Sequence, residues 1–216
     1  MTGMKVFQDL IVFPAVGDFN IRNEIISKEN EDWVHDGGKE TDLANGFAPD
    51  EDVIVFHRRA YRNIDDSILI LWKYNDRYSV TNIVPQNVGE LGVDKYNSII
   101  NDFVERIISP LSESGVLTFE LTKSEKDIRD ILSDKTASLI EVFSRLANKS
   151  TGASHPLDKE RWIKFLIESH VHDEKCTATD LMQWFVEIEK WPEEKASELA
   201  ISYEFSRDLL NSYDKR

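Results

Sequence analysis

Residues 116–122, VLTFELT, decide the fold, because the hydrophobic period of the chain changes directly after them. Leu117, Phe119 and Leu121 alternate with polar residues, which is the period of a half-buried strand. From residue 125 onwards, apolar residues recur every three or four positions, which indicates helices. We therefore predict an α+β protein in which this strand closes an N-terminal part and a helical C-terminal part follows.

The residues before this strand predict a sheet with two helices. The helix signals cover 19–29, capped by Asp18, and 93–111, which is the cleanest amphipathic pattern of the first half. Asn75-Asp76 separates two strand patterns and favours a hairpin. We expect a mostly antiparallel sheet, with a ferredoxin-like variant as the first choice. The strands are expected over 5–13, 52–60, 67–74, 77–84 and 116–122.

The residues after the strand predict a bundle of four helices. Two of them cover 125–147 and 158–171. The third follows a capping box from Thr177 to Asp180, and Pro192 opens the last. Two domains are expected, residues 1–122 and 125–216.

Composition restricts the class of partner. The 216-residue chain has a formal net charge of −14, which argues against a nucleic-acid backbone and against anionic membranes as partners. The same charge suits a basic protein partner, although many proteins are acidic for solubility alone. A single cysteine, Cys176, and the absence of a signal-peptide pattern or a membrane-length apolar run favour the cytoplasm.

The charge is concentrated near the N-terminus. Residues 18–52 hold eleven acidic and three basic residues, and so carry −8 of the total. Residues 30–52 follow neither the helix nor the strand period, so we expect a long acidic loop. Trp33 and Phe47 within it either pack into the body of the protein, which we favour, or anchor a partner. The candidate partner-binding residues are Glu31, Asp32, Trp33, Asp36, Glu40, Asp42 and Phe47.

A basic cluster follows the acidic segment. The stretch FHRRAYRN, residues 56–63, contains Arg58, Arg59 and Arg62, which are candidates for binding a phosphate or carboxylate. Because opposite charges are adjacent in the sequence, we favour internal ion pairs over an external anion.

The stretch ANKSTGASHPLDKERW, residues 147–162, has the polar crowding of an anion cradle. We interpret it mainly as a hinge between two domains, followed by a helix that Asp158 caps. The alternative is an anion site, whose candidate residues are Lys149, Ser150, Thr151 and Lys159. The phosphate-binding motif GxxxxGK[ST] is missing, and Ser154 lies in no nucleophile elbow.

No cofactor, metal or catalytic residue is expected. His170, His172 and Cys176 lack a fourth spaced ligand for zinc. The aromatic residues of the helical part have the spacing of a core, although a surplus could line a groove for a partner helix. They are Trp162, Phe165, Trp184, Phe185, Trp191, Tyr203 and Phe205.

These observations favour binding over catalysis. We expect an acidic protein-interaction module, of the inhibitor, antitoxin, immunity or adaptor type, whose partner is a more basic protein. The alternative is a ligand-responsive sensor that binds a small anion or nucleotide at the basic cluster or at the interdomain hinge, residues 147–162. An enzyme whose site is assembled from distant residues comes third.

Overall fold

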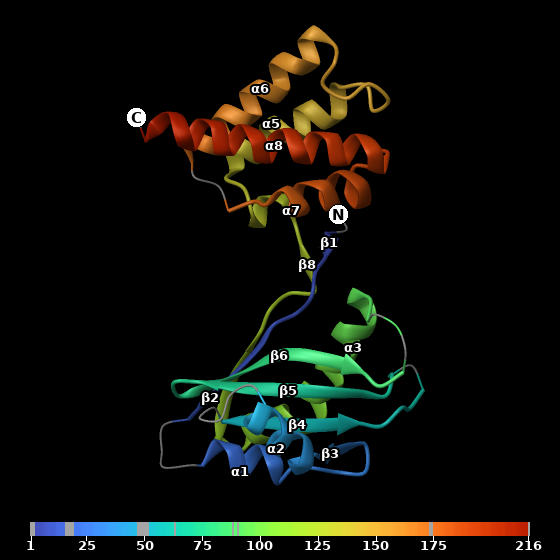
Figure 1. The fold of residues 1–216 in the computed structure, drawn as a ribbon, viewed down its shortest axis with the longest axis vertical. Helices are drawn as coiled ribbons and strands as arrows, with labels where there is room; N and C mark the ends of the chain where they lie inside the picture. Colours follow the sequence, from blue (N-terminus) through green and yellow to red (C-terminus); the bar gives the residue numbers. More distant parts are fainter. Residues whose placement is uncertain are drawn as a thin grey trace. The chain divides into compact units, whose positions relative to one another are not determined.

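A computed structural model describes residues 3–15, 20–46, 52–62, 64–87, 89, 91–172 and 175–215. The chain divides into two compact units, each with its own hydrophobic core. The sheet unit is Val6–Ser124, and the helical unit combines Met1–Lys5 with Glu125–Arg216 (Figure 1). The architecture is therefore α+β with a helical C-terminal part, as predicted.

The sheet unit contains one six-stranded sheet, in which every pair of described strands is antiparallel. Its strand order, β3-β4-β5-β6-β2-β7, differs from a ferredoxin-like sheet, because a split βαβ unit places two strands in parallel. The strands are β2 (Leu10–Pro14), β3 (Trp33–His35), β4 (Val53–Arg58), β5 (Ser67–Tyr74), β6 (Arg77–Pro85) and β7 (Leu117–Leu121).

The predicted hairpin is confirmed. Tyr74 pairs with Arg77, so Asn75 and Asp76 form a two-residue turn between β5 and β6. Asn75 adopts a φ of 55°, which asparagine tolerates better than most residues. Asparagine can therefore serve here where a glycine would be expected.

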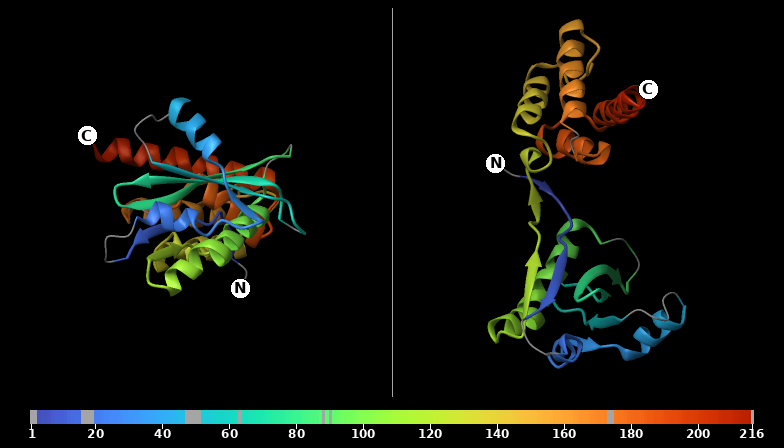
Figure 2. Two further views of the ribbon diagram at one scale, coloured as in Figure 1. Left: turned by 90° about the horizontal axis from the view of Figure 1, so that it is seen from below. Right: turned by 90° about the vertical axis from the view of Figure 1, so that its left-hand side faces the viewer.

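Both faces of the sheet carry helices, with α1 and α3 on one side and α2 on the other (Figure 2). The predicted helix over 93–111 is confirmed, although its middle turn is a π-helix. The first helix begins after Asn20, whose side chain accepts a hydrogen bond from the Asn23 amide. Asp18, its predicted cap, lies outside the described residues. The helical segments are α1 (Ile21–Ile26), α2 (Gly37–Gly46), α3 (Val93–Phe103), η1 (Val104–Ile108) and α4 (Ser109–Glu113).

The prediction of a long acidic loop over 30–52 was wrong for the residues that the structure describes. This segment contains β3 and α2. Three residues of strand are too few to show an alternating pattern, and Gly37 and Gly38 obscure the helix signal. Asp36 stabilises the start of α2, because its Oδ1 accepts a hydrogen bond from the Lys39 amide at 3.0 Å.

The helical unit begins with a short antiparallel pair, in which Met4 and Lys5 of β1 face Lys126 and Glu125 of β8. The strand predicted over 5–13 is therefore split between the two units. The helix predicted over 125–147 is also wrong in its first half, where a 3-10 turn follows β8. The helices are η2 (Ile128–Asp130), α5 (Asp134–Leu146), α6 (Pro156–Val171), α7 (Ala178–Gln183), η3 (Trp184–Ile188, a π-helix) and α8 (Glu193–Asp214).

Aromatic side chains fill the core of the helical unit, as their spacing predicted. Phe143 of α5 stacks on Trp191, with ring centroids 5.6 Å apart. Phe165 of α6 stacks on Tyr203 of α8 at 5.7 Å, which joins the two helices. The predicted capping box of Thr177 and Asp180 is confirmed at the start of α7. Within the described part of the chain, no helix is both long and apolar enough to cross a membrane.

Candidate functional site

Trp33, a candidate anchor for a partner, is fully buried in the sheet unit. Its ring packs edge-on against Phe56 and Phe103. Its Nε1 donates a hydrogen bond to Asp102 Oδ2 at 2.8 Å. The favoured interpretation, that Trp33 packs into the body of the protein, is confirmed, so this residue offers no surface to a partner.

Arg58, a candidate anion ligand, is also buried, with an exposed fraction of 0%. Two carboxylates neutralise it: its Nε lies 2.8 Å from Asp102 Oδ2, and its Nη1 lies 3.4 Å from Asp32 Oδ1. Arg106 joins them through Asp32 at 2.7 Å. Arg58 of the basic cluster thus pairs with Asp32 of the acidic segment, as the adjacency of their charges predicted, but its closer partner, Asp102, lies outside that segment.

This network sets the pKa of the Asp102 carboxyl. Burial by itself would raise the pKa, because it disfavours the charged form. Hydrogen bonds from Arg58, Trp33 and Arg106 favour the carboxylate and outweigh burial, so the pKa lies below its ordinary value. Asp102 is therefore a structural anion.

A second network engages Glu40. Its carboxylate pairs with Arg22, lies 2.7 Å from His35 Nε2 and accepts a hydrogen bond from the Val55 amide at 3.0 Å. Arg22 also reaches Asp52 at 2.7 Å. Burial raises the pKa of the Tyr78 hydroxyl, and its hydrogen bond to the Asp52 carboxylate raises it further.

Few of the predicted residues of the sheet unit remain on the surface. Glu31 and Asp42 are exposed, as are Arg59 and Arg62, whose guanidinium lies 5.1 Å from the Tyr61 ring centroid. Phe47 lies outside the described residues. Because Trp33 is buried and Asp32 and Glu40 hold internal cations, the structure does not present the predicted partner-binding set as one exposed surface.

The 147–162 stretch connects α5 to α6 within the helical unit, so the prediction of a hinge between two domains was wrong. The prediction that Asp158 caps α6 was wrong: the helix begins at Pro156, and His155 Nδ1 accepts the hydrogen bond of the Leu157 amide at 3.3 Å. A proline in the first turn suits this earlier start, because it lacks the amide that would need a partner. Asp158 lies in the first turn of α6, where it is buried and pairs with Arg161 at 2.6 Å.

The predicted anion ligands of this stretch are mostly engaged locally. The amide and hydroxyl of Ser150 both donate to Asn148 Oδ1, and the Thr151 amide donates to the Asn148 carbonyl oxygen. Lys149 Nζ donates to the carbonyl oxygen of Glu189. Lys159 is exposed and lines a groove described below.

The histidines near Cys176 also have local partners. His170 Nε2 lies 2.7 Å from Asp214 Oδ2, and His172 Nδ1 lies 3.1 Å from Glu168 Oε1. Cys176 is buried. Among the described residues, no group of three histidine, cysteine or acidic side chains is placed to hold a metal ion.

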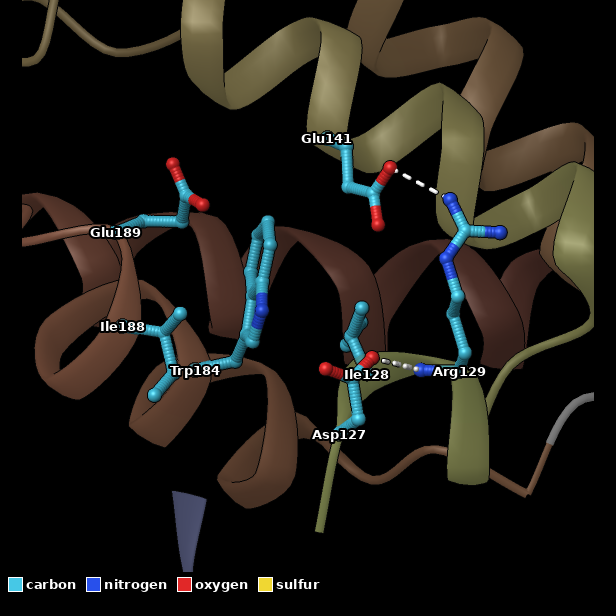
Figure 3. Close-up of a pocket in the computed structure, with 7 residues that line it drawn as sticks. All are labelled: Asp127, Ile128, Arg129, Glu141, Trp184, Ile188 and Glu189. Carbon is cyan, nitrogen blue, oxygen red and sulfur yellow. Dashed lines mark hydrogen bonds and ion pairs between the residues drawn. The ribbon is translucent and has the colours of Figure 1, made fainter. Parts of the chain in front are cut away.

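A cavity of about 660 Å³ opens beside the π-helix η3 in the helical unit (Figure 3). Its lining includes Trp184 and the carboxylates of Asp127, Glu141 and Glu189, with Arg129 as the sole basic side chain. Arg129 is already paired with Glu141 at 2.7 Å and with Asp134 at 3.0 Å. The excess of carboxylates disfavours a phosphate or another small anion here.

The helices α6 and α8 carry most of the exposed apolar side chains. They hold eight of the thirteen large hydrophobic residues that are exposed in the described part of the chain. Exposed apolar side chains that gather on neighbouring elements are candidates for an interaction surface. We define the α6–α8 apolar surface as Ile163, Ile167, Phe205, Leu209 and Tyr213.

These five side chains lie on neighbouring flanks of the two helices. Ile163 and Phe205 line one groove, which also contains Ser202 and has a volume of about 550 Å³. Trp162 Nε1 donates to Ser202 Oγ at 3.1 Å, which joins α6 to α8 at this level.

Beyond the groove, the helices converge toward their C-terminal ends, where His170 pairs with Asp214 (Figure 1). Ile167 follows Ile163 by one turn, and Leu209 and Tyr213 follow Phe205 at the same interval. The exposed apolar rows therefore run from the groove toward the point where the helices meet.

The helical spacing favoured a core position for Phe205, with a groove for a partner helix as the alternative. Phe205 is 66% exposed. A signal was present: in α8 the apolar residues form two rows, one through Leu199 and Tyr203, and the other through Phe205 and Leu209. One row is enough to bury a helix against its neighbours, so a second row indicates a second contact.

Comparisons with known proteins give no family for this chain, which matches no protein-family model, no curated protein and no solved structure.

Proposed function

We propose that this protein is an acidic protein-interaction module that binds a more basic protein partner through the α6–α8 apolar surface. The observation that carries the proposal is the row of exposed apolar side chains on each of two adjacent helices, beside a groove. Burying such a surface against a partner is favourable by about 25 cal/mol per Å² of apolar area.

The charge distribution supports a basic partner. The chain carries −14, and α8 alone has six acidic residues and two basic ones. Charge complementarity of this kind accelerates association and selects the partner. Inhibitors, antitoxins, immunity proteins and adaptors all use it, and they are the classes we propose.

The proposed binding surface lies in the helical unit and does not include the acidic segment of the sheet unit. Asp32 and Glu40 hold internal cations there, and Trp33 is buried. The carboxylates of Asp32 and Glu40 are thus engaged within the sheet unit. A cytoplasmic location is part of the proposal, and it rests on the single cysteine of the chain.

Photo-cross-linking in the native lysate tests this function. A photoreactive phenylalanine analogue in place of Leu209 is expected to yield a discrete, stoichiometric cross-link to a basic protein. The same analogue in place of Tyr74, an equally exposed aromatic residue of the sheet unit, provides the matched control. A cross-link that forms equally from both positions, or from neither, contradicts the proposal.

The alternative of a sensor for a small anion has less support. Arg58, the centre of the basic cluster, is buried and paired, and Lys149 is engaged by Glu189. A thermal-shift screen with nucleotides and small acids tests it, since a ligand that binds only the folded state raises the melting temperature.

A further inference from the structure

We infer that the cavity beside η3 binds an organic ammonium ion, a primary amine carried on an apolar stem. The cavity shares no lining residue with the α6–α8 apolar surface, so this site goes beyond the proposed function and is tested separately. Three observations support the site: an indole N–H without a partner, two carboxylates without a cation, and the size and apolar lining of the cavity.

The indole N–H of Trp184 is a polar group that the helical unit leaves without a partner. Trp33, Trp162 and Trp191 are buried to the same degree, and each donates its N–H to a side-chain oxygen, at 2.8, 3.1 and 2.7 Å. Trp184 is only 3% exposed, yet its N–H donates to no described residue. This N–H is not sealed within the core, so it opens into the cavity that Trp184 lines. A buried indole N–H normally has an acceptor, and a bound ligand supplies one here.

Two carboxylates of the lining have no cation. Glu141 is neutralised by Arg129 at 2.7 Å, but Asp127 and Glu189 form no ion pair with a described residue. Asp127 Oδ1 accepts only the amide of Arg129, at 3.0 Å. Glu189 Oε2 accepts the hydroxyl of Ser144 at 2.7 Å. The lining therefore keeps two uncompensated negative charges, which attract a cation.

The π-helix η3 explains why Trp184 and Glu189 lie at the same cavity. Five residues span about 1.4 turns of an α-helix, which would place these side chains on different faces. In η3 the Glu189 amide instead donates to the Trp184 carbonyl oxygen at 3.1 Å, so a single wider turn separates them. Figure 3 shows the ring of Trp184 between Glu189 and Ile128. Lys149 contacts the backbone oxygen of Glu189 and not its carboxylate, which stays available.

The size and lining of the cavity favour an organic cation. Its volume of about 660 Å³ lies within the range of small-molecule sites. Ile128, Ile188 and the Trp184 ring offer apolar contacts to the methylene stem of an amine, a part that a bare metal ion lacks. The ammonium group donates to Asp127 and Glu189, and an oxygen of the same ligand accepts the Trp184 N–H.

Matched derivatives of lysine test the site. Nα-acetyl-lysine methylamide carries the ammonium group, the stem and carbonyl acceptors, and its Nε-acetylated form has a neutral amide in place of the ammonium. Isothermal titration calorimetry with the full chain measures each dissociation constant. The charged derivative is expected to bind at least about tenfold more tightly than the neutral one, because only it pairs with the two carboxylates.

The ligand has two possible sources, a lysine side chain of a protein or a free amine. Aminopentanol has a similar stem, the same charge and a hydroxyl acceptor, but no peptide groups. Tighter binding of the charged lysine derivative than of aminopentanol assigns the cavity to a protein lysine, and the reverse order assigns it to a free amine. Both orders support an ammonium site.

Substitutions that remove one charge assign the binding to the cavity. Asp127→Asn and Glu189→Gln each keep an oxygen for the local hydrogen bond, and asparagine remains a good helix cap. Each is expected to weaken binding of the charged derivative at least about fivefold and to leave the neutral one unaffected. Asp208→Asn, which removes an exposed carboxylate of α8 outside this lining, is the matched control and leaves both affinities unchanged.

The Trp184 indole N–H provides a second readout at the site. In proton–nitrogen correlation spectra, the charged derivative is expected to shift this resonance, whereas those of Trp162 and Trp191, already bonded to serines, stay in place. Trp184→Phe assigns the resonance by removing it, and the charge variants provide the test if that variant does not fold.

Three outcomes would overturn the ammonium site. The first is equal affinity for the charged and neutral derivatives, and the second is no binding of either amine at millimolar concentration. The third is binding that Asp127→Asn and Glu189→Gln leave unchanged, because the amine then binds elsewhere on the chain.

Discussion

Arg58 is a fully buried cation, and its place in the sheet unit depends on Asp102 and Asp32. Its Nη2 has no hydrogen-bond partner among the described residues, so the network is incompletely satisfied. Buried charges tolerate this only while the paired carboxylates remain. The residue that looked most like an anion ligand in the sequence is therefore held in an internal ion-pair network.

Replacing Asp102 tests this dependence. Asp102→Asn preserves the shape of the side chain but leaves Arg58 with only the more distant carboxylate of Asp32, so the free energy of unfolding is expected to fall by about 3–5 kcal/mol. Asp42→Asn removes an exposed carboxylate and is expected to change it by less than about 0.5 kcal/mol. Urea unfolding measures both, and equal effects of the two substitutions would contradict the assigned role.

The lowered pKa of Asp102 makes the stability of the protein depend on pH. The pKa of Asp102 is lower in the folded state, so its contribution is present above the ordinary aspartate pKa of about 3.9 and is lost as pH falls through the folded value. The difference in unfolding free energy between the wild type and Asp102→Asn is therefore expected to shrink from pH 6 to pH 3. A difference that grows on acidification would contradict a lowered pKa of Asp102 in the folded state.

At the scale of elements, the sequence predicted the long helices and the hairpin well and the short elements poorly. The periodicity of 93–111 and the Asn75-Asp76 turn are local signals, and both are confirmed. β3 and η2 each have three residues, which is too few for a period to appear. Periodicity identifies an apolar row on a helix, but it does not say whether a neighbour covers that row, and Phe205 was misplaced for this reason.

A buried and an exposed phenylalanine of the helical unit are expected to differ in their effect on stability. Phe165 is fully buried, and Phe165→Ala is expected to lower the free energy of unfolding by about 3–5 kcal/mol. Phe205→Ser is expected to change it by less than about 0.5 kcal/mol, because the side chain is already in water. Thermal and urea unfolding compare the variants, and a large loss for Phe205→Ser would show that this row packs against the protein itself.

At the scale of the whole molecule, the change of period after residue 122 lies near the border between the units, but the path of the chain was not predicted. Met4 is 1% exposed in the core of the helical unit, although 119 residues of sheet unit separate it from the helices. Pairing between strands so distant in the sequence has no local signature. Whether each unit folds alone stays a prediction.

The position of Met4 predicts a selective effect. Met4→Ala is expected to destabilise the helical unit by about 2–5 kcal/mol, because it leaves a cavity next to Ile128 and the aromatic core. Amide hydrogen exchange should accelerate in α5–α8 and remain unchanged in β4–β6. Phe7→Ala, at an exposed residue of the sheet unit, is the control. Faster exchange in the sheet unit alone would contradict the assignment of Met4.

The pairing of β1 with β8 also has a consequence for biosynthesis. The sheet unit is a continuous segment, whereas Met4, which is made before it, has no helices to join until the residues after 124 are made. At typical translation rates, the 92 residues of Glu125–Arg216 require roughly 5–20 s. During this interval β1 has no β8 to pair with, and Met4 has no helical core to enter.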